Sequence, residues 1–482
     1  MALVTDLEEE RAPAPPVESA EPRTRRRIRH RPAHLAPRRT GAWLLSPAVL
    51  ASYLLLVVIY FAGAWAHPAH RVVGSPGDPS LFIWYLGWVP WAIAHGHNPL
   101  LSTWVNAPHG VNLMWNTSML LPGLVLAPLT EWWGALVTYN VLVTAGLALS
   151  GWTAWLALRK VCGVRAGAAW LGGLVFAFSP FMVAQAYGHL HLVFAFLLPL
   201  LAVAVHEIVV TQHRSARRGG LVLGVLAGAQ FLTGEELLAI AAIALGVAVV
   251  VAAALSPRLA RPRAPHAVRA AFWAVAGFVI VAGFPLAYQY LGPQSVHGPV
   301  QPRDHYVADL LAPVTPTSWQ WLHPWGALAT AARFQSHGAE WCAYLGVPLI
   351  ALMLAGTLTG LRRRGVLVAT ATAVVLVVFS FGPHLQINGH HTGIWMPWSA
   401  LGWMSPLDSL LPVRLMIAVD LIAAGMIAVV ADAAWTAIRN RRATGALLAG
   451  ATALVVVSLL PAGMARTAAE VKNDGTLSGE AR

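Results

Sequence analysis

The chain has 482 residues, of which 57% are hydrophobic and only 11% are charged. Soluble domains carry about 25% charged residues, so this composition excludes an ordinary soluble fold and predicts an integral membrane protein. The net charge of +12 comes from arginines in short clusters between long apolar runs, a pattern that indicates membrane orientation and argues against nucleic acid as a partner.

Residues 1–41 are predicted to form a disordered, basic cytoplasmic tail. They run from an acidic start through prolines to Arg38 and Arg39 and contain almost nothing to bury. The paired arginines resemble a twin-arginine export signal, but the apolar run behind them is too long and lacks a convincing cleavage site. This favours a first helix that is retained.

About eleven segments meet the requirement of roughly 20 mostly apolar residues for a spanning helix. They are residues 42–66, 135–158, 166–185, 190–211, 219–234, 237–256, 270–291, 343–361, 366–383, 413–435 and 443–461. Residues 119–133 are apolar but short and contain Pro122 and Pro128, so we expect them to lie along the outer interface. The predicted fold class is an all-α polytopic membrane protein with about 11 transmembrane helices.

Basic residues fall on alternate loops between these segments. The clusters lie at residues 159–165, 214–218, 258–269, 362–364 and 439–442. Because cationic loops stay cytoplasmic, we expect a multi-pass plasma-membrane protein with its N-terminus inside and its C-terminus outside. Residues 42–461 then form the transmembrane domain, with outer loops at 67–134, 292–342 and 384–412 and a short outer tail at 462–482. Cys162 and Cys342 fall on opposite faces, too far apart for a disulfide.

The first outer loop carries the most suggestive carboxylate, Asp78. A helix is expected from here to His95, because Trp84, Trp88 and Trp91 recur at helical spacing and form one aromatic face. One reading makes Asp78 the N-cap of this helix, with proline in the next position. The other makes it a base at the outer mouth of the first spanning helix, able to take a proton from a hydroxyl.

The layout resembles the GT-C membrane glycosyltransferases, which include the protein O-mannosyltransferases and the oligosaccharyltransferases. The resemblance rests on a long first outer loop that opens with Asp78, an amphipathic helix, and Asn98-Pro99-Leu100 before the in-plane stretch. Phe178-Ser179-Pro180-Phe181 and Pro412-Val413-Arg414 add to it. It implies a GT-C-like fold, a sugar donor carried on a polyprenyl phosphate, and Asp78 as the catalytic base. Many members have two adjacent acids here, whereas this chain has proline after Asp78.

Other polar groups at the predicted outer face are candidates for substrate binding. Arg414 lies at the start of a spanning helix and suits the donor phosphate, the alternatives being a snorkelling arginine or a salt bridge to Asp408 or Asp420. Arg303, in an outer loop, is a second candidate for the phosphate. Trp84 and Trp88 are candidates for stacking on a sugar ring, although tryptophans also form interfacial belts.

Two further pairs are less specific. Glu235 and Glu236 are expected at an outer turn, where they are either solvated or face a cavity and bind acceptor or metal. His189 and His191 would point the same way in an extended chain and are weak candidates for a divalent metal, with ordinary hydrogen bonding as the favoured reading. No other cofactor is predicted.

The function expected from these features is transfer of a sugar from a polyprenyl-phosphate donor to a hydroxyl at the outer face, with inversion. The acceptor would be a glycan, lipid or protein of the cell envelope. Two alternatives stay open: a transporter or flippase of lipid-linked sugars, for which Asp420 is nearly the only ionisable group deep within a span, and a non-catalytic assembly subunit.

Overall fold

The computed structural model describes residues 42–75, 77–117, 119–360, 363–404, 407–462 and 468–470. The predicted tail at 1–41 and most of the predicted tail at 462–482 lie outside these residues. The elements below belong to the compact unit Leu44–Arg482, apart from the first two residues of the first helix.

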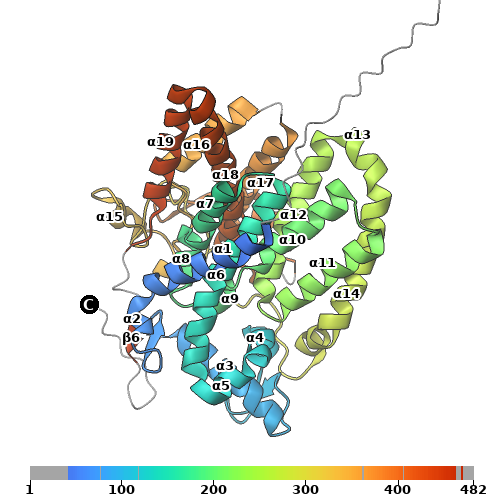
Figure 1. Ribbon diagram of the computed structural model, residues 1–482. Coiled ribbons are helices and arrows are strands. Elements are labelled where there is room, and N and C mark those ends of the chain that lie inside the picture. Colours follow the sequence, from blue (N-terminus) through green and yellow to red (C-terminus); the bar gives the residue numbers. More distant parts are fainter. Residues whose placement is uncertain are drawn as a thin grey trace, which may run out of the picture. The chain divides into compact units, whose positions relative to one another are not determined.

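The described chain is mostly helical (Figure 1). The longer helices are α1 (Ala42–Tyr60), α3 (Asp78–Ala94), α6 (Ala135–Val161), α7 (Ala166–Ala177), α10 (Leu197–His206), α11 (Ala216–Phe231), α12 (Glu235–Leu255), α14 (Ala264–Leu291), α16 (Val347–Gly360), α17 (Arg364–Ser380), α18 (Met416–Asn440) and α19 (Arg442–Leu459). The shorter ones are α2 (Ala62–Trp65), α4 (Leu120–Val125), α5 (Ala127–Trp133), α8 (Pro180–Gln185), α9 (Leu190–Val193), α13 (Pro257–Ala260) and α15 (Ala327–Ala331).

Short turns and strands complete the described chain. The 3-10 turns are η1 (Leu113–Asn116), η3 (Arg261–Arg263), η4 (Gly338–Glu340), η5 (Pro397–Ala400), η6 (Leu407–Ser409) and η7 (Pro412–Leu415), and η2 (Glu207–Thr211) is a π-helical turn. Three antiparallel strand pairs join β1 (Arg71–Val73) to β6 (Ala468–Glu470), β2 (Leu101–Ser102) to β3 (Val111–Asn112), and β4 (His384–Ile387) to β5 (His390–Trp395).

Each predicted span coincides with one helix or with two or three shorter helical segments, but not all of these helices are long enough to cross a membrane unaided. Five helices are long and apolar enough by length and composition: Ala135–Val161, Glu235–Leu255, Pro257–Leu291, Pro412–Asn440 and Arg442–Leu459. The protein is therefore a helical membrane protein, and the figure of about eleven transmembrane helices stays a prediction. Residues 119–133 form only α4 and α5, of six and seven residues, as their short length and prolines predict.

The predicted span 166–185 is interrupted near its C-terminal end. Helix α7 ends at Ala177, and α8 begins at Pro180 with Ser179 as its N-cap, whose hydroxyl accepts a hydrogen bond from the Met182 amide at 3.3 Å. Proline has no amide hydrogen and is favoured in the first turn of a helix, so Ser179-Pro180 starts a new helix instead of continuing the old one. This break leads the chain into the turn that carries His189.

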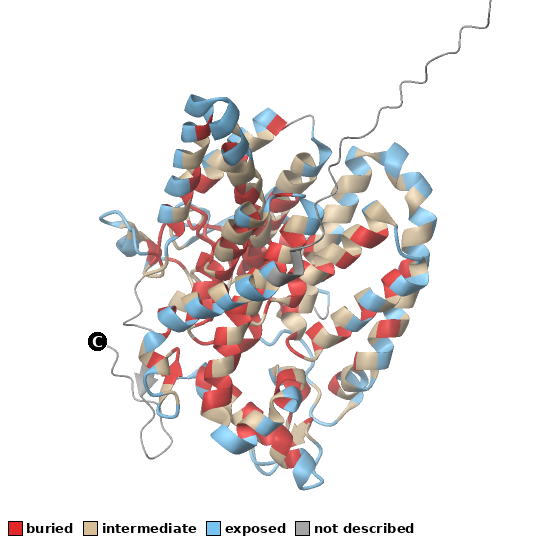
Figure 2. Ribbon diagram, in the orientation of Figure 1, coloured by how far each residue is buried: buried red, intermediate tan, exposed pale blue. Residues whose placement is uncertain are grey.

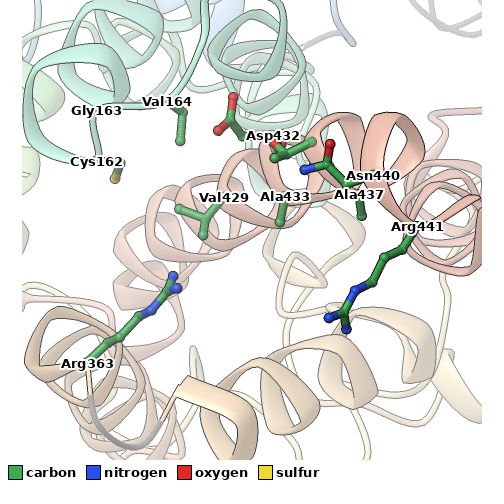
Figure 3. A pocket seen from close by; sticks show the side chains of 11 residues that line it. Cys162, Gly163, Val164, Arg363, Val429, Asp432, Ala433, Ala437, Asn440 and Arg441 are labelled. Atoms are coloured by element: carbon green, nitrogen blue, oxygen red, sulfur yellow. The ribbon is translucent and has the colours of Figure 1, made fainter. Parts of the chain in front are cut away.

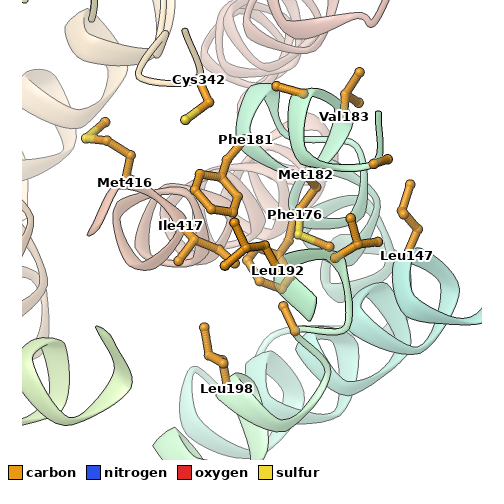
Figure 4. Packing of buried hydrophobic residues seen from close by; sticks show 14 of the residues in the cluster. Leu147, Phe176, Phe181, Met182, Val183, Leu192, Leu198, Cys342, Met416 and Ile417 are labelled. Carbon is orange, nitrogen blue, oxygen red and sulfur yellow. The ribbon is translucent and has the colours of Figure 1, made fainter. Parts of the chain in front are cut away.

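Helices α6, α7 and α18 form the buried centre of the unit. Residues in the spans of α6 and α18 are 72% buried, against 17% to 28% for the peripheral helices α12, α14 and α19, and Figure 2 shows the same gradient from centre to edge. Figure 4 shows Phe181 and Met182 of α8 packed with Ile417 of α18 and Leu192 of α9. This packing holds α8, α9 and the start of α18 beside one another.

Helices α11 and α14 pack closely through glycines of α11 at every fourth position, Gly220, Gly224 and Gly228. A Cβ atom added to Gly224 would lie 2.1 Å from the carbonyl oxygen of Ala274 and 2.7 Å from the amide nitrogen of Phe278. Small residues at such spacing let helix backbones approach inside a membrane.

We expect Gly224→Val to destabilise the protein by about 1–3 kcal/mol or more, because neither backbone atom can move away without shifting α14. Thermal unfolding of the purified protein measures this. The control is Gly246→Val in α12, where an added Cβ meets nothing within 4 Å. Equal melting temperatures for the two variants would contradict the close packing of α11 and α14.

The basic loops lie together. Loop residues Cys162 and Gly163, Arg363 and Arg441 line one cavity, and Lys160 and Arg214 line another. The remaining basic loop, at residues 258–269, contacts the loop that carries Arg214, because the Gln212 side chain donates to the carbonyl oxygen of Arg263 at 3.1 Å. Conversely, β6 near the C-terminus pairs with β1 of the first predicted outer loop. If basic and non-basic loops alternate between the two faces of the membrane, all basic loops must lie at one end of the helices, as they do here. Which end faces the cytoplasm stays a prediction.

Candidate active site

The carboxylate of Asp78 is the exposed end of a polar cluster that also contains His189, Glu340, Arg414 and Glu236. Helix α3 is capped by Gly77, whose φ of 120° suits glycine, and Asp78 is its first residue. The reading of Asp78 as the N-cap is wrong, because the helix has no side-chain cap. The Asp78 Oδ2 atom lies 3.0 Å from Nε2 of His189, and 58% of the Asp78 side chain is exposed. The hydrogen bond from His189 lowers the pKa of Asp78, which is therefore ionised at neutral pH.

His189 is held from its other side. Its Nδ1 atom lies 2.5 Å from Oε1 of Gln185 and 4.0 Å from Oε1 of Glu340. Only 9% of its side chain is exposed. The glycine before it brings the chain close, since a Cβ atom added to Gly188 would lie 3.8 Å from Cβ of Asp78. The turn after α8 therefore orients an imidazole against one oxygen of Asp78 and leaves the rest of the carboxylate accessible.

Replacing His189 by Ala is expected to raise the pKa of Asp78, because the hydrogen bond that favours the ionised form is lost. As the pH falls, any reaction step that needs ionised Asp78 should therefore slow at a higher pH in His189→Ala than in the unmodified protein. His337 and His191 also act on this carboxylate and remain in the variant. His189→Gln, which keeps a donor, should restore part of the difference. An unchanged acidic limb of the pH profile in His189→Ala would contradict this role.

Arg414 lies at the centre of the cluster and is 7% exposed. Its Nε donates to both carboxylate oxygens of Glu340 at 3.2 Å, and its Nη2 donates to Oε1 of Glu340 at 2.5 Å. Its Nη1 donates to Oε2 of Glu236 in a short hydrogen bond. The expected salt-bridge partners, Asp408 and Asp420, are wrong: the partners come from α12 and from η4. The two carboxylates outweigh the single guanidinium by one negative charge.

Glu340 is the fully buried member of the cluster, with none of its side chain exposed. Burial alone raises the pKa of Glu340, but the adjacent Arg414 charge and its hydrogen bonds outweigh burial and bring the pKa below its ordinary value. The turn that carries Glu340 is tied to α8, because Gln185 Nε2 donates to the Ala339 carbonyl oxygen at 3.0 Å. A distant loop thus inserts an ionised acid between His189 and Arg414.

The paired glutamates at the start of α12 have separate roles. The Glu236 side chain is 14% exposed, contacts Arg414, and lies 3.6 Å from Nε2 of His191. Oε2 of Glu235 accepts a hydrogen bond from the Gln289 side chain at 3.2 Å. The reading of this turn as solvated and without contacts is therefore wrong, since Glu236 belongs to the cluster around Arg414.

His189 and His191 are not placed to bind the same metal ion. The chain between them is not extended, because His189 precedes α9 and His191 lies within it. Their rings are 6.1 Å apart and inclined by 77°, and each Nε2 faces a different acid, Asp78 or Glu236. Among the described residues no group of three or more histidine, cysteine or acidic side chains is placed to hold a metal ion.

The remaining predicted candidates lie outside this cluster. Trp84 and Trp88 stack on one another at 5.4 Å and continue through Trp91, on a side of α3 different from that of Phe82, which contacts His191. Arg303 is exposed, and within the described part of the chain its side chain has no hydrogen bond or ion pair.

Several members of the cluster were not predicted from the sequence: Glu340, Gln185, His337 and Tyr306. The His337 ring lies 6.2 Å from that of His189 and 6.0 Å from that of Tyr306. Tyr306 in turn borders the start of α18, because its carbonyl oxygen accepts from the Val413 amide at 3.3 Å. The scarcity of acids in the predicted outer loops is the one sequence signal that could have singled out Glu340.

Comparisons with known proteins give a family match and partial structural likenesses, among them the following two. The chain resembles the archaeal oligosaccharyltransferase AglB from Archaeoglobus fulgidus, solved with an inhibitory peptide and a dolichol-phosphate, at 15% identity over 88% of this chain and 57% of that one, with a TM-score of 0.45. It resembles ArnT from Cupriavidus metallidurans, solved with undecaprenyl phosphate, at 14% identity over 87% of this chain and 70% of that one, with a TM-score of 0.41. The chain thus spans little more than half the length of AglB.

No curated protein matches the chain in sequence. A family model described as "Domain of unknown function (DUF6311)" matches residues 48–411, well over half of the chain. The match includes Asp78, His189, Glu236 and Glu340 and ends three residues before Arg414. The chain therefore belongs to the DUF6311 family.

Proposed function

We propose that the protein is a membrane glycosyltransferase that moves a sugar from a polyprenyl-phosphate donor to a hydroxyl acceptor at the outer face of the membrane. The observation that carries the proposal is the accessibility of Asp78. It is the acid of the cluster that a substrate can reach, since its side chain is 58% exposed against 14% for Glu236 and none for Glu340. His189 and the residues behind it hold it in one orientation.

In the proposed reaction the acceptor hydroxyl transfers its proton to the free oxygen of Asp78 as its own oxygen attacks the anomeric carbon. The bond from that carbon to the phosphate oxygen breaks, and polyprenyl phosphate leaves with the bonding electrons. A single displacement inverts the anomeric configuration. Because phosphate is a good leaving group, no strong general acid is needed. The negative charge of Asp78 also stabilises the oxocarbenium-like transition state.

The buried residues around Arg414 are proposed to position His189 and the start of α18. A donor phosphate would have to displace Glu340 or Glu236 from the guanidinium, and displacing either partner would leave a buried carboxylate unpaired. We therefore assign phosphate binding to Arg303 in place of Arg414, since its guanidinium is exposed and its loop leads into Tyr306 beside the cluster.

Arg303→Ala is expected to raise the KM for the donor by about tenfold or more, because a charge-assisted contact to phosphate contributes roughly 1.5–3 kcal/mol. The melting temperature should stay close to that of the unmodified protein, since Arg303 is exposed. Steady-state kinetics with varied donor measures this, with Arg333→Ala on the same outer loop as the control. An unchanged KM in Arg303→Ala would remove Arg303 from the donor site.

The test of the function is incubation of the purified protein with polyprenyl phosphate carrying a labelled sugar and with glycan, lipid or peptide acceptors. Label transferred to an acceptor supports the proposal. Movement of the intact donor across vesicles without transfer indicates a flippase. Absence of both activities in a folded protein indicates an assembly subunit.

A further inference from the structure

The cavity between the basic loops lies at the other end of α18 from Arg414. It has a volume of about 460 Å³, and its lining includes Cys162, Arg363, Asp432, Asn440 and Arg441 (Figure 3). Helix α18 has 25 residues, which separates the two ends by about 37 Å. The cavity is therefore distinct from the proposed active site.

Three basic loops contribute to this cavity. They are the α6–α7 connection at Cys162, the α16–α17 connection at Arg363, and the α18–α19 connection at Arg441. Figure 3 shows Arg363 and Arg441 on different sides of the cavity, with Val429 and Ala433 of α18 between them. Two guanidinium groups from distant parts of the chain thus border one space.

The charges in the cavity favour an anion. The one lining acid, Asp432, is already neutralised, because its Oδ1 accepts from the Arg165 backbone amide at 3.0 Å and from Arg165 Nη1 at 3.1 Å. In the described part of the chain, neither Arg363 nor Arg441 has a carboxylate within 4.0 Å. The lining therefore presents two positive charges that no described side chain offsets.

The rest of the lining favours an amphiphile at the membrane surface. Val164, Val429, Ala433 and Ala437 are apolar, and they lie next to the arginines and the Asn440 amide. Trp435 of the same helix is 60% exposed. Tryptophan is enriched at the level of the lipid headgroups, which places the cavity there. Basic pockets between helices at this level bind anionic lipid headgroups.

We propose that this cavity binds the phosphate group of an anionic phospholipid from the leaflet on the side of the basic loops. Arg363 and Arg441 would contact the phosphate oxygens, as arginine forks do. The apolar part of the lining would cover the glycerol and the first carbons of the acyl chains. The bound lipid would join the ends of α7, α16 and α18.

The chain supplies its own reporter for this site. Cys162 lines the cavity and is exposed, whereas Cys342 is buried. Labelling of Cys162 by N-ethylmaleimide, an uncharged reagent, is followed by peptide mass spectrometry. The pH is mildly alkaline, because the residue is exposed as a whole but partial desolvation of its thiol raises the pKa of that group. The full-length protein is compared in vesicles of phosphatidylcholine and in vesicles of phosphatidylcholine mixed with phosphatidylglycerol.

We expect phosphatidylglycerol to slow the labelling of Cys162 several-fold. Arg363→Gln together with Arg441→Gln should abolish the protection, while Arg364→Gln together with Arg442→Gln should keep it. The second pair removes the same charge from the adjacent positions, which do not line the cavity. The two pairs differ in contact with the phosphate, which only Arg363 and Arg441 border. Loss of two charge-assisted contacts in the first pair is expected to weaken binding about 100-fold.

Three results would overturn the proposal. One is the absence of protection by phosphatidylglycerol, and another is equal loss of protection in the two double variants. The third is full protection by inorganic phosphate in phosphatidylcholine vesicles, which would identify a soluble phosphate as the ligand. Melting temperatures confirm that each variant is folded, and the single variant Arg441→Gln replaces the double one should the latter unfold. None of these outcomes depends on transferase activity.

Discussion

Asp78→Asn is expected to lower the rate of sugar transfer by about 10²- to 10⁴-fold, the usual contribution of a general base. Asparagine has nearly the same shape and can still accept a hydrogen bond from His189, so the fold should be retained. It cannot accept the proton of the attacking hydroxyl, and it carries no negative charge to stabilise the transition state. Transfer of labelled sugar by the purified variant measures the loss.

A matched control is available in the chain. Asp304 is a second partly exposed aspartate paired with a histidine, at 3.1 Å from His384, and has 39% of its side chain exposed. Asp304→Asn should leave kcat unchanged, because Asp304 is not part of the cluster around Arg414. Undiminished transfer by Asp78→Asn would exclude Asp78 as the base.

Arg414→Ala is expected to destabilise the protein by about 3–5 kcal/mol, the cost of leaving a buried charge without its partner. The carboxylates of Glu340 and Glu236 would lose their counter-charge in a place where water cannot replace it. Arg414→Lys should recover only part of this, because an ammonium cannot reproduce the donor geometry of a guanidinium. Thermal unfolding of the purified protein measures both.

The pH dependence of the Arg414 effect has a definite sign. The pKa of Glu340 is below its ordinary value in the folded protein, so its ion pair stabilises the fold above the ordinary pKa, and this contribution is lost as the pH falls through the folded pKa. In Arg414→Ala, burial raises the pKa of Glu340, and protonation relieves the unpaired charge. The stability difference between the two proteins should therefore shrink as the pH falls. A variant as stable as the unmodified protein at neutral pH would contradict the ion-pair arrangement.

Much of the candidate site could be predicted because polar groups are rare in this chain. Asp78, His189, Glu236 and Arg414 each interrupt or border an apolar run, and the structure places all of them in one cluster. Their partners could not be predicted, because pairing depends on how distant loops return. Glu340 follows a long irregular loop whose path is set by contacts such as the one from Gln185 to Ala339.

The predictions that were wrong also failed because the sequence does not show how separate segments pack against one another. Helical spacing correctly identified the aromatic face of α3 but could not tell which side of the helix would meet His191. The Asp78-Pro79 sequence is typical of an N-cap, yet Gly77 takes that position and frees the carboxylate. Proline signals were more reliable, since Pro180 begins a new helix and residues 119–133 form only short ones.

The most direct test is an experimental structure of the protein in a lipid bilayer with a non-reactive polyprenyl-phosphate sugar. We expect the anomeric carbon beside the exposed oxygen of Asp78, the phosphate at Arg303, and Arg414 still paired with Glu340. A donor bound away from Asp78, or an Asp78 closed off from any bound sugar, would contradict the assignment of this cluster as the site of transfer.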